Sequence, residues 1–194
     1  MTQNTFILLI VATFTVIILI LLFVNKRKES ASRQMATILK PYVLDEIRDI
    51  IVPDGIGGLL EIEHLILMEQ GLLLIETYPM SGNMFGAETI DQWTQLIGGR
   101  SYKFANPLRH IRTSRQALMI LAPNLPIFCR VVFNADSIFP KGKPEEVSVL
   151  SSLSDDLLNI GPSSVKMDPS SQVWQRIMRI ARKDGQAVQR DGEL

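Results

Sequence analysis

The chain has 194 residues, of which 46% are hydrophobic, and its acidic and basic side chains balance to a formal net charge of zero. This balance excludes a uniformly polybasic or polyacidic protein, and the lone Cys129 excludes a disulfide framework. His64 and His110 lie near no other His or Cys at zinc-ligand spacing, so we expect no structural zinc site. Cys129 lies in the apolar run 127–133 and is expected in the core.

Residues 6–24 are apolar or uncharged, and the basic cluster 26–28 follows them directly. A helix of this length spans roughly 28 Å, close to the hydrocarbon thickness of a bilayer. A cleaved signal peptide, the alternative, would carry its positive charge before the apolar stretch. We therefore predict one transmembrane helix at 6–24 and a basic, polar linker at 25–33. The positive-inside rule then predicts a single-pass protein of the inner or plasma membrane with a cytoplasmic C-terminal domain.

The rest of the chain is long enough for one domain of ordinary size. Hydrophobic periodicity, turn residues and caps predict its elements. In chain order they are a helix at 32–39, strands at 47–52, 59–68 and 72–78, a loop at 81–90, a strand around Tyr102, a helix at 106–121, strands at 127–134 and 147–150, a short helix after Ser152, and a last helix at 168–185. This order predicts an α/β fold with a mixed central sheet flanked by helices.

Two helix starts carry cap signals, because Asn106 precedes a proline and Ser152 is followed by Asp155. The last helix is amphipathic, with basic residues opposite an apolar face. It is either an ordinary helix packed on the domain or a surface for membrane or phosphate. We assign residues 34–160 to the domain and residues 161–194 to this helix and a tail.

Charge is unevenly distributed along the domain. Residues 45–91 contain ten acidic side chains and one base, whereas residues 92–135 contain no acid. Two interpretations remain: a polyanion bound beside a metal, or pairing of the two segments across the fold. The candidate nucleic-acid-binding residues of the basic segment are Lys103, Arg109, Arg112 and Arg115.

Two carboxylates lie toward the ends of adjacent predicted strands. Pairing of these strands across the turn at Gly71 brings Glu63 close to Glu76, and strand alternation places Tyr78 on the same face as Glu76. Two converging carboxylates suit Mg²⁺, which could activate water and bind phosphate. The alternative is a pair of solvated edge residues, which this spacing alone does not exclude.

The segments EIEHLIL (61–67), GLLLIET (71–77), SGNMFG (81–86), FANPL (104–108) and RVVFNAD (130–136) occur together and in this order. From residue 47 to residue 158 the chain thus resembles the nuclease-related domain (NERD), a relative of the PD-(D/E)XK restriction-endonuclease fold. The resemblance implies a central sheet flanked by helices and a site for divalent metal, Mg²⁺, that hydrolyses phosphodiesters.

The resemblance also implies a site made of an acid in the second strand and Glu-x-Lys in the third. The acid falls on Glu63, where the family has Asp, and the glutamate falls on Glu76. The lysine falls on Tyr78, which carries no positive charge at neutral pH. A further family glutamate would fall near Ser32, and the glutamine after Asn-Pro corresponds to His110.

Losing a cation at a phosphoryl transition state typically costs about a thousandfold in rate. We therefore expect a catalytically degenerate site, formed by Glu63, Glu76 and Tyr78, in a bacterial-type membrane protein that binds DNA or RNA. One alternative is an atypical metal-dependent nuclease using Glu63 and Glu76, with Lys103 or Arg109 supplying the missing charge. Another is a membrane-tethered module for protein interaction.

Overall fold

The structure is a computed structural model that describes residues 3–161 and 166–183, with only the backbone described at 3–11, 23–25, 27, 28, 182 and 183. It divides into two compact units, residues 1–38 and residues 39–194. Each unit is described by itself. The predicted tail beyond residue 183 lies outside the described residues.

The first unit is a helix, α1, that runs from Gln3 to Leu39. It ends two residues before Pro41, as the sequence predicts. The basic, polar residues 25–33 are helical, because α1 continues through them and none of them is a proline or glycine that would interrupt it. Among the residues that the structure describes, no helix combines the length and apolar character needed to cross a membrane.

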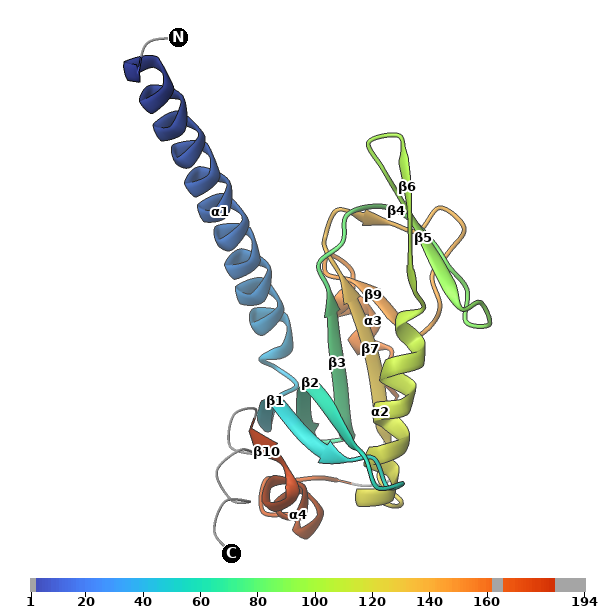
Figure 1. The fold of residues 1–194 in the computed structure, drawn as a ribbon. Coiled ribbons are helices and arrows are strands. Elements are labelled where there is room, and N and C mark those ends of the chain that lie inside the picture. The colour runs from blue at the N-terminus through green and yellow to red at the C-terminus, as the bar shows by residue number, and fades with distance from the viewer. Residues whose placement is uncertain (1–2, 162–165, 184–194) are drawn as a thin grey trace, which may run out of the picture. The chain divides into compact units, whose positions relative to one another are not determined.

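A mixed sheet of six strands forms the centre of the second unit (Figure 1), which confirms the predicted α/β architecture. In spatial order its strands are β10 (Arg182–Lys183), β1 (Asp45–Pro53), β2 (Leu59–Met68), β3 (Gly71–Tyr78), β7 (Ile127–Phe133) and β9 (Val147–Val149). The first four strands are antiparallel to one another, and β7 and β9 continue parallel to β3.

The apolar run of β3 is explained by its central place in this sheet. Its residues 71–76 are buried, β2 and β7 flank the strand on its two sides, and α2 packs against it. Gly71 has φ 147°, and a Cβ there would come within 2.2 Å of the Pro126 carbonyl oxygen. A glycine is therefore required where the turn from β2 passes the start of β7.

A second sheet was not predicted. Its four strands are, in spatial order, β6 (Arg100–Ala105), β5 (Gln92–Ile97), β4 (Gly82–Phe85) and β8 (Ser137–Ile138). The predicted loop at 81–90 is wrong in its first half, because Gly82–Phe85 pairs with β5 and β8. The strand expected around Tyr102 is present as β6. Short strands with few hydrophobic residues give a weak periodicity signal, which explains the difference.

Helix α2 (Pro107–Leu121) packs along β2, β3 and β7 (Figure 1). The predicted cap is confirmed, because Asn106 Oδ1 accepts the Leu108 backbone N–H at 2.9 Å. Ser152 stands at the N-cap of α3 (Leu153–Leu158), but its side chain forms no capping bond. Its hydroxyl contacts Asp156 instead of completing the predicted capping box with Asp155.

The last helix, α4 (Gln172–Ile180), is shorter than predicted and leads into β10. Ser171 caps it, so Asp168-Pro169 forms the turn before the helix rather than its start. Trp174 and Ile177 are buried in the core, as the apolar face predicts. The indole N–H of Trp174 donates to Asp45 Oδ2 at 2.7 Å, which fixes α4 against the start of β1.

Candidate active site at the ends of strands β2 and β3

Glu63 and Thr77 make a side-chain bridge where the pairing of β2 and β3 ends. The last paired residues of the two strands are His64 and Ile75, so the same register places Glu63 opposite Glu76. Glu63 Oε2 accepts the Thr77 backbone N–H at 2.7 Å, and Oε1 accepts the Thr77 hydroxyl at 2.6 Å. The carboxylate of Glu63 thus accepts the Thr77 backbone N–H, which a backbone carbonyl of β2 would accept if the pairing of the two strands continued.

Glu76 is a buried carboxyl with a histidine partner. Its side chain is 7% exposed, and its Oε1 lies 2.6 Å from Nδ1 of His110 on α2. The imidazole itself is half exposed. Because a buried carboxylate is costly without a partner, His110 explains how an apolar strand can end on glutamate.

The charges of Glu63 and Glu76 act on one another and on Tyr78. Burial raises the pKa of Glu76 above its ordinary value, the charge of Glu63 raises this pKa further, and His110 opposes the shift. Burial, followed by the charges of Glu76 and Glu63, raises the pKa of the Tyr78 hydroxyl. Tyr78 therefore stays neutral and supplies no cation.

The ring of Tyr78 belongs to an aromatic cluster. It packs against Phe133 with ring centroids 5.6 Å apart, and Phe133 stacks on Trp93 at 6.3 Å with an interplanar angle of 11°. Phe104 and Phe139 complete the cluster around Trp93. The ring of Tyr78 thus contributes to the apolar core between the two sheets. A lysine at position 78 could contribute to this core only through its aliphatic stem.

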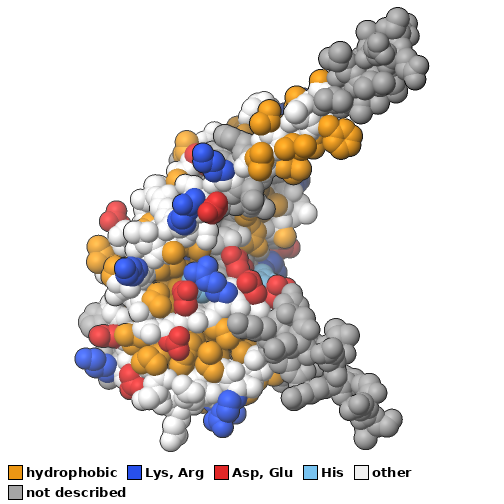
Figure 2. Space-filling view, turned by 90° about the vertical axis from the view of Figure 1, so that its left-hand side faces the viewer, with side chains coloured by type: hydrophobic (Ala, Val, Ile, Leu, Met, Phe, Trp, Pro, Cys, Tyr) orange, Lys and Arg blue, Asp and Glu red, His pale blue; other side chains and the backbone are white. Residues whose placement is uncertain are grey.

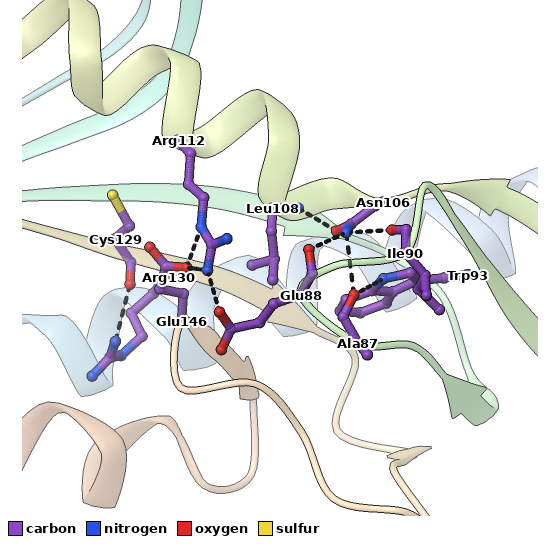
Figure 3. A network of polar contacts seen from close by, with 10 residues as sticks. All are labelled: Ala87, Glu88, Ile90, Trp93, Asn106, Leu108, Arg112, Cys129, Arg130 and Glu146. Atoms are coloured by element: carbon purple, nitrogen blue, oxygen red, sulfur yellow. Dashed lines mark hydrogen bonds and ion pairs between the residues drawn. The ribbon is translucent and has the colours of Figure 1, made fainter.

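The start of α2, which carries His110, is fixed by a hydrogen-bond network (Figure 3). Asn106 is buried, and its Nδ2 donates to the backbone carbonyl oxygens of Ile90, Glu88 and Ala87 at 2.7, 3.2 and 3.3 Å. The indole N–H of Trp93 donates to the same Ala87 oxygen at 3.1 Å. One asparagine therefore caps the helix and holds the loop before β5, and this positions His110 over the end of β3.

Two of the predicted nucleic-acid-binding residues are paired with carboxylates. Arg112 Nε donates to Glu146 at 2.7 Å, and its guanidinium also lies 3.0 Å from Glu88 (Figure 3). Arg109 pairs with Asp91. Glu88 and Asp91 belong to the acidic segment, so for these two arginines the structure favours pairing of the two segments. Among the described side chains, Lys103 and Arg115 form no ion pair.

Mg²⁺ is the metal that the family resemblance implies. It demands near-octahedral coordination by hard oxygens, often one or two carboxylates and several waters. Any ion shared by the two carboxylates would need an oxygen of Glu63, and both already accept hydrogen bonds from Thr77. In the arrangement described, an ion that bridges Glu63 and Glu76 would have to share the Glu63 oxygens with the hydrogen bonds from Thr77. The described residues also contain no group of three His, Cys, Asp or Glu side chains placed to hold a metal.

Sequence reasoning missed Thr77 and the role of His110. Strand alternation points the Thr77 side chain away from Glu76, so only the backbone register reveals that Thr77 donates to Glu63. His110 was placed by resemblance alone, and the contact with Glu76 spans 34 positions of the sequence. A histidine in the first turn of a helix that follows an apolar, glutamate-ending strand is the signal that could have indicated it.

The fold and site define a class: an α/β domain with a pair of carboxylates at the ends of adjacent central strands, covered by a helix. The sequence profile described as "Nuclease-related domain" (NERD) matches residues 26–134, more than half of the chain. The chain therefore belongs to the nuclease-related domain family.

One relative adds to this assignment. An uncharacterized protein of Bacillus anthracis is 27% identical over 92 residues, which cover 45% of this chain and 43% of the relative. The chain thus spans less than half the length of that relative. No solved structure is significantly similar to the chain.

Proposed function

We propose that this nuclease-related domain is anchored to a membrane, faces the cytoplasm, and binds nucleic acid without cleaving it at the rate of a complete nuclease. The observation that carries the proposal is the state of the acidic pair. Both oxygens of Glu63 accept from Thr77, and Oε1 of Glu76 lies against His110. The oxygens of the pair thus form hydrogen bonds within the fold, and a metal ion that hydrolyses phosphodiesters would have to share these oxygens.

Tyr78 supports the loss of catalysis. A phosphodiester gains negative charge as it is cleaved, and a positioned cation stabilises that charge. At the position of the family lysine stands a neutral phenol whose ring packs on Phe133. No contact among the described side chains brings Lys103 or Arg109 to either carboxylate, so the two substitutes considered from the sequence gain no support.

Nucleic-acid binding is supported by charge. Residues 92–135 contain no acidic side chain, and this segment forms β5, β6, α2 and β7. Arg100, Lys103 and Arg115 of this segment are exposed and have no ion-pair partner among the described side chains. Such charge raises the local concentration of a polyanion and makes its binding depend on salt. Membrane anchoring rests on the apolar segment 6–24 and the bases after it, and the described side chains of this segment, at 12–22, are exposed.

The activity is tested with the full-length chain in detergent and labelled DNA and RNA oligonucleotides in Mg²⁺ or Mn²⁺. We expect retention of the oligonucleotide that weakens with salt, and intact oligonucleotide after long incubation. Cleavage that disappears in Glu76→Ala would establish the atypical nuclease instead. If neither cleavage nor binding is observed at low salt, the result would favour the alternative function, a membrane-tethered module for protein interaction.

The anchor is tested by fractionating cells that express the full-length chain and the chain without residues 1–28. We expect the full-length chain to remain with membranes after washing in high salt or carbonate and to dissolve in detergent. The shortened chain should be released by the salt wash. A reporter fused after residue 194 that is active only outside the cytoplasm would contradict the proposed orientation.

A further inference from the structure

The hairpin of β5 and β6 extends beyond the six-stranded sheet and carries no acidic side chain (Figure 1). Its strands pair from Gln92 with Ala105 to Ile97 with Arg100, and Gly98 and Gly99 form the turn with φ 57° and 74°. Both φ values lie in the left-handed region that a tight two-residue turn requires. All residues from Leu96 to Lys103 are exposed.

The base of the hairpin is anchored, and its tip is not. Trp93 pairs with Phe104, and their rings meet edge to face with centroids 6.1 Å apart within the aromatic cluster. Trp93 is fully buried, whereas Tyr102, two residues from Phe104 on the same face, is 48% exposed. A rigid base therefore presents a tyrosine ring to solvent.

The basic side chains of the hairpin differ from those of α2. Arg109 and Arg112 are neutralised by carboxylates, whereas Arg100 and Lys103 have no carboxylate partner among the described side chains. Arg100 shares a face with Tyr102, and Lys103 lies on the opposite face of the same strand. Two unpaired cations thus lie together on the hairpin, whereas on α2 only Arg115 of the three regularly spaced arginines has no carboxylate partner among the described side chains.

Elsewhere on the described surface many basic side chains have acidic neighbours. On the face drawn in Figure 2, basic side chains lie among acidic ones. Two such ion pairs are Arg48 with Glu46 at 3.5 Å and Arg33 with Glu29 at 3.2 Å. A mixed surface attracts a polyanion weakly, because each cation is offset by a neighbouring acid.

We propose that the β5–β6 hairpin is a binding arm for single-stranded nucleic acid, in which Tyr102 stacks on an unpaired base and Arg100 and Lys103 contact phosphates. This inference rests on the proposed function and names its contact surface and the form of its ligand. Stacking on an aromatic side chain needs a base whose face is open, which a single strand offers and a duplex does not. Arg100 on the face of the ring and Lys103 on the opposite face of the strand contact phosphates without reading the base sequence.

The test is fluorescence anisotropy of the full-length chain in detergent with a labelled twenty-nucleotide oligo-dT, its RNA counterpart and a duplex of equal length. We expect single strands of both kinds to bind more tightly than the duplex. Tyr102→Ala should weaken binding by about tenfold, and Tyr102→Phe, which keeps the ring, should bind as the unchanged protein does. Arg100→Ala combined with Lys103→Ala should reduce the slope of log affinity against log salt by about 1.4.

The matched control is Arg176→Ala combined with Arg179→Ala, which removes two exposed cations from α4. Two results would overturn the proposed role of the hairpin and leave the proposed function intact. In the first, the hairpin variants bind as tightly as the unchanged protein. In the second, the α4 variant loses as much affinity as the hairpin variants do. A duplex bound as tightly as a single strand, with no effect of Tyr102→Ala, would overturn the single-strand assignment. Absence of binding by the unchanged protein would refute both the arm and the proposed binding function. Equal unfolding temperatures of all variants establish that each comparison is between folded proteins.

Discussion

The imidazole of His110 and the carboxyl of Glu76 meet at 2.6 Å, so the first turn of α2 closes over the end of β3. This contact joins the helix to an apolar strand in the middle of the sheet. It also gives a buried glutamate its partner, and the energetics of the domain should therefore depend on it.

Replacing His110 by Ala should destabilise the domain most at neutral pH. Burial already raises the pKa of Glu76, and His110 opposes that shift, so the variant should raise the pKa further. A carboxyl with a raised folded-state pKa contributes stability that is present at low pH and lost as pH rises through that value. We expect a loss of about 2 kcal/mol at pH 7.5 and a smaller loss at pH 4.5, measured by urea unfolding.

The double variant Glu76→Gln with His110→Ala controls for the loss of packing by the imidazole. It should show the same loss at both pH values, because a neutral amide replaces the titrating carboxyl. An equal, pH-independent loss in His110→Ala alone would contradict the assigned pairing.

The bridge from Thr77 to Glu63 predicts a loss of stability in Thr77→Val, which keeps the shape of the side chain and removes the hydroxyl. Glu63 then loses the 2.6 Å hydrogen bond but keeps the bond to the backbone N–H. We expect a loss of about 1–2 kcal/mol in the free energy of unfolding. Thr113→Val is the control, because the Thr113 hydroxyl only donates to the Arg109 carbonyl within an exposed helix turn; a similar loss there would argue against a special role for Thr77.

The contacts of Glu76 with His110 and of Glu63 with Thr77 show which features of the site can be predicted from the sequence. The apolar run and turn around Gly71 predict β2 and β3. Strand alternation predicts that Glu76 and Tyr78 share a face, and pairing across the turn predicts that Glu63 lies close to Glu76. The cap at Asn106 predicts where α2 begins. The partners of the carboxylates do not follow in the same way, because His110 and Thr77 meet them through tertiary packing and backbone register. The small second sheet escaped prediction because its strands are short and largely exposed.

Gly86 should not tolerate a side chain. A Cβ at this position would lie 2.1–2.5 Å from ring atoms of Trp93, which is fully buried in the aromatic cluster. Gly86→Ala should therefore cost about 1–3 kcal/mol, which corresponds to a fall of several degrees in the unfolding temperature. Gly161→Ala is the matched control, since a Cβ there meets nothing within 4 Å. If both variants melt together, the packing of Trp93 against Gly86 is wrong.

Two arginines of α2, Arg112 and Arg115, should differ in their contribution to the stability of the domain. Arg112→Ala leaves Glu146, whose side chain is 17% exposed, without its cation, whereas Arg115 has no ion-pair partner among the described side chains. We expect Arg112→Ala to lower the free energy of unfolding by about 1–2 kcal/mol and Arg115→Ala to change it by less than about 0.5 kcal/mol. Thermal unfolding at low and high salt measures both. Equal effects of the two substitutions would show that the contacts of Arg112 contribute little.

The proposed loss of hydrolysis is tested most directly by single-turnover cleavage, with the full-length chain in excess over a labelled single-stranded oligonucleotide in Mg²⁺ or Mn²⁺. A carboxylate pair closed by Thr77 and His110, beside a neutral tyrosine, predicts that the bound oligonucleotide stays intact over hours. Metal-dependent cleavage by the unchanged protein that Glu76→Ala abolishes and Arg176→Ala leaves alone would contradict this account.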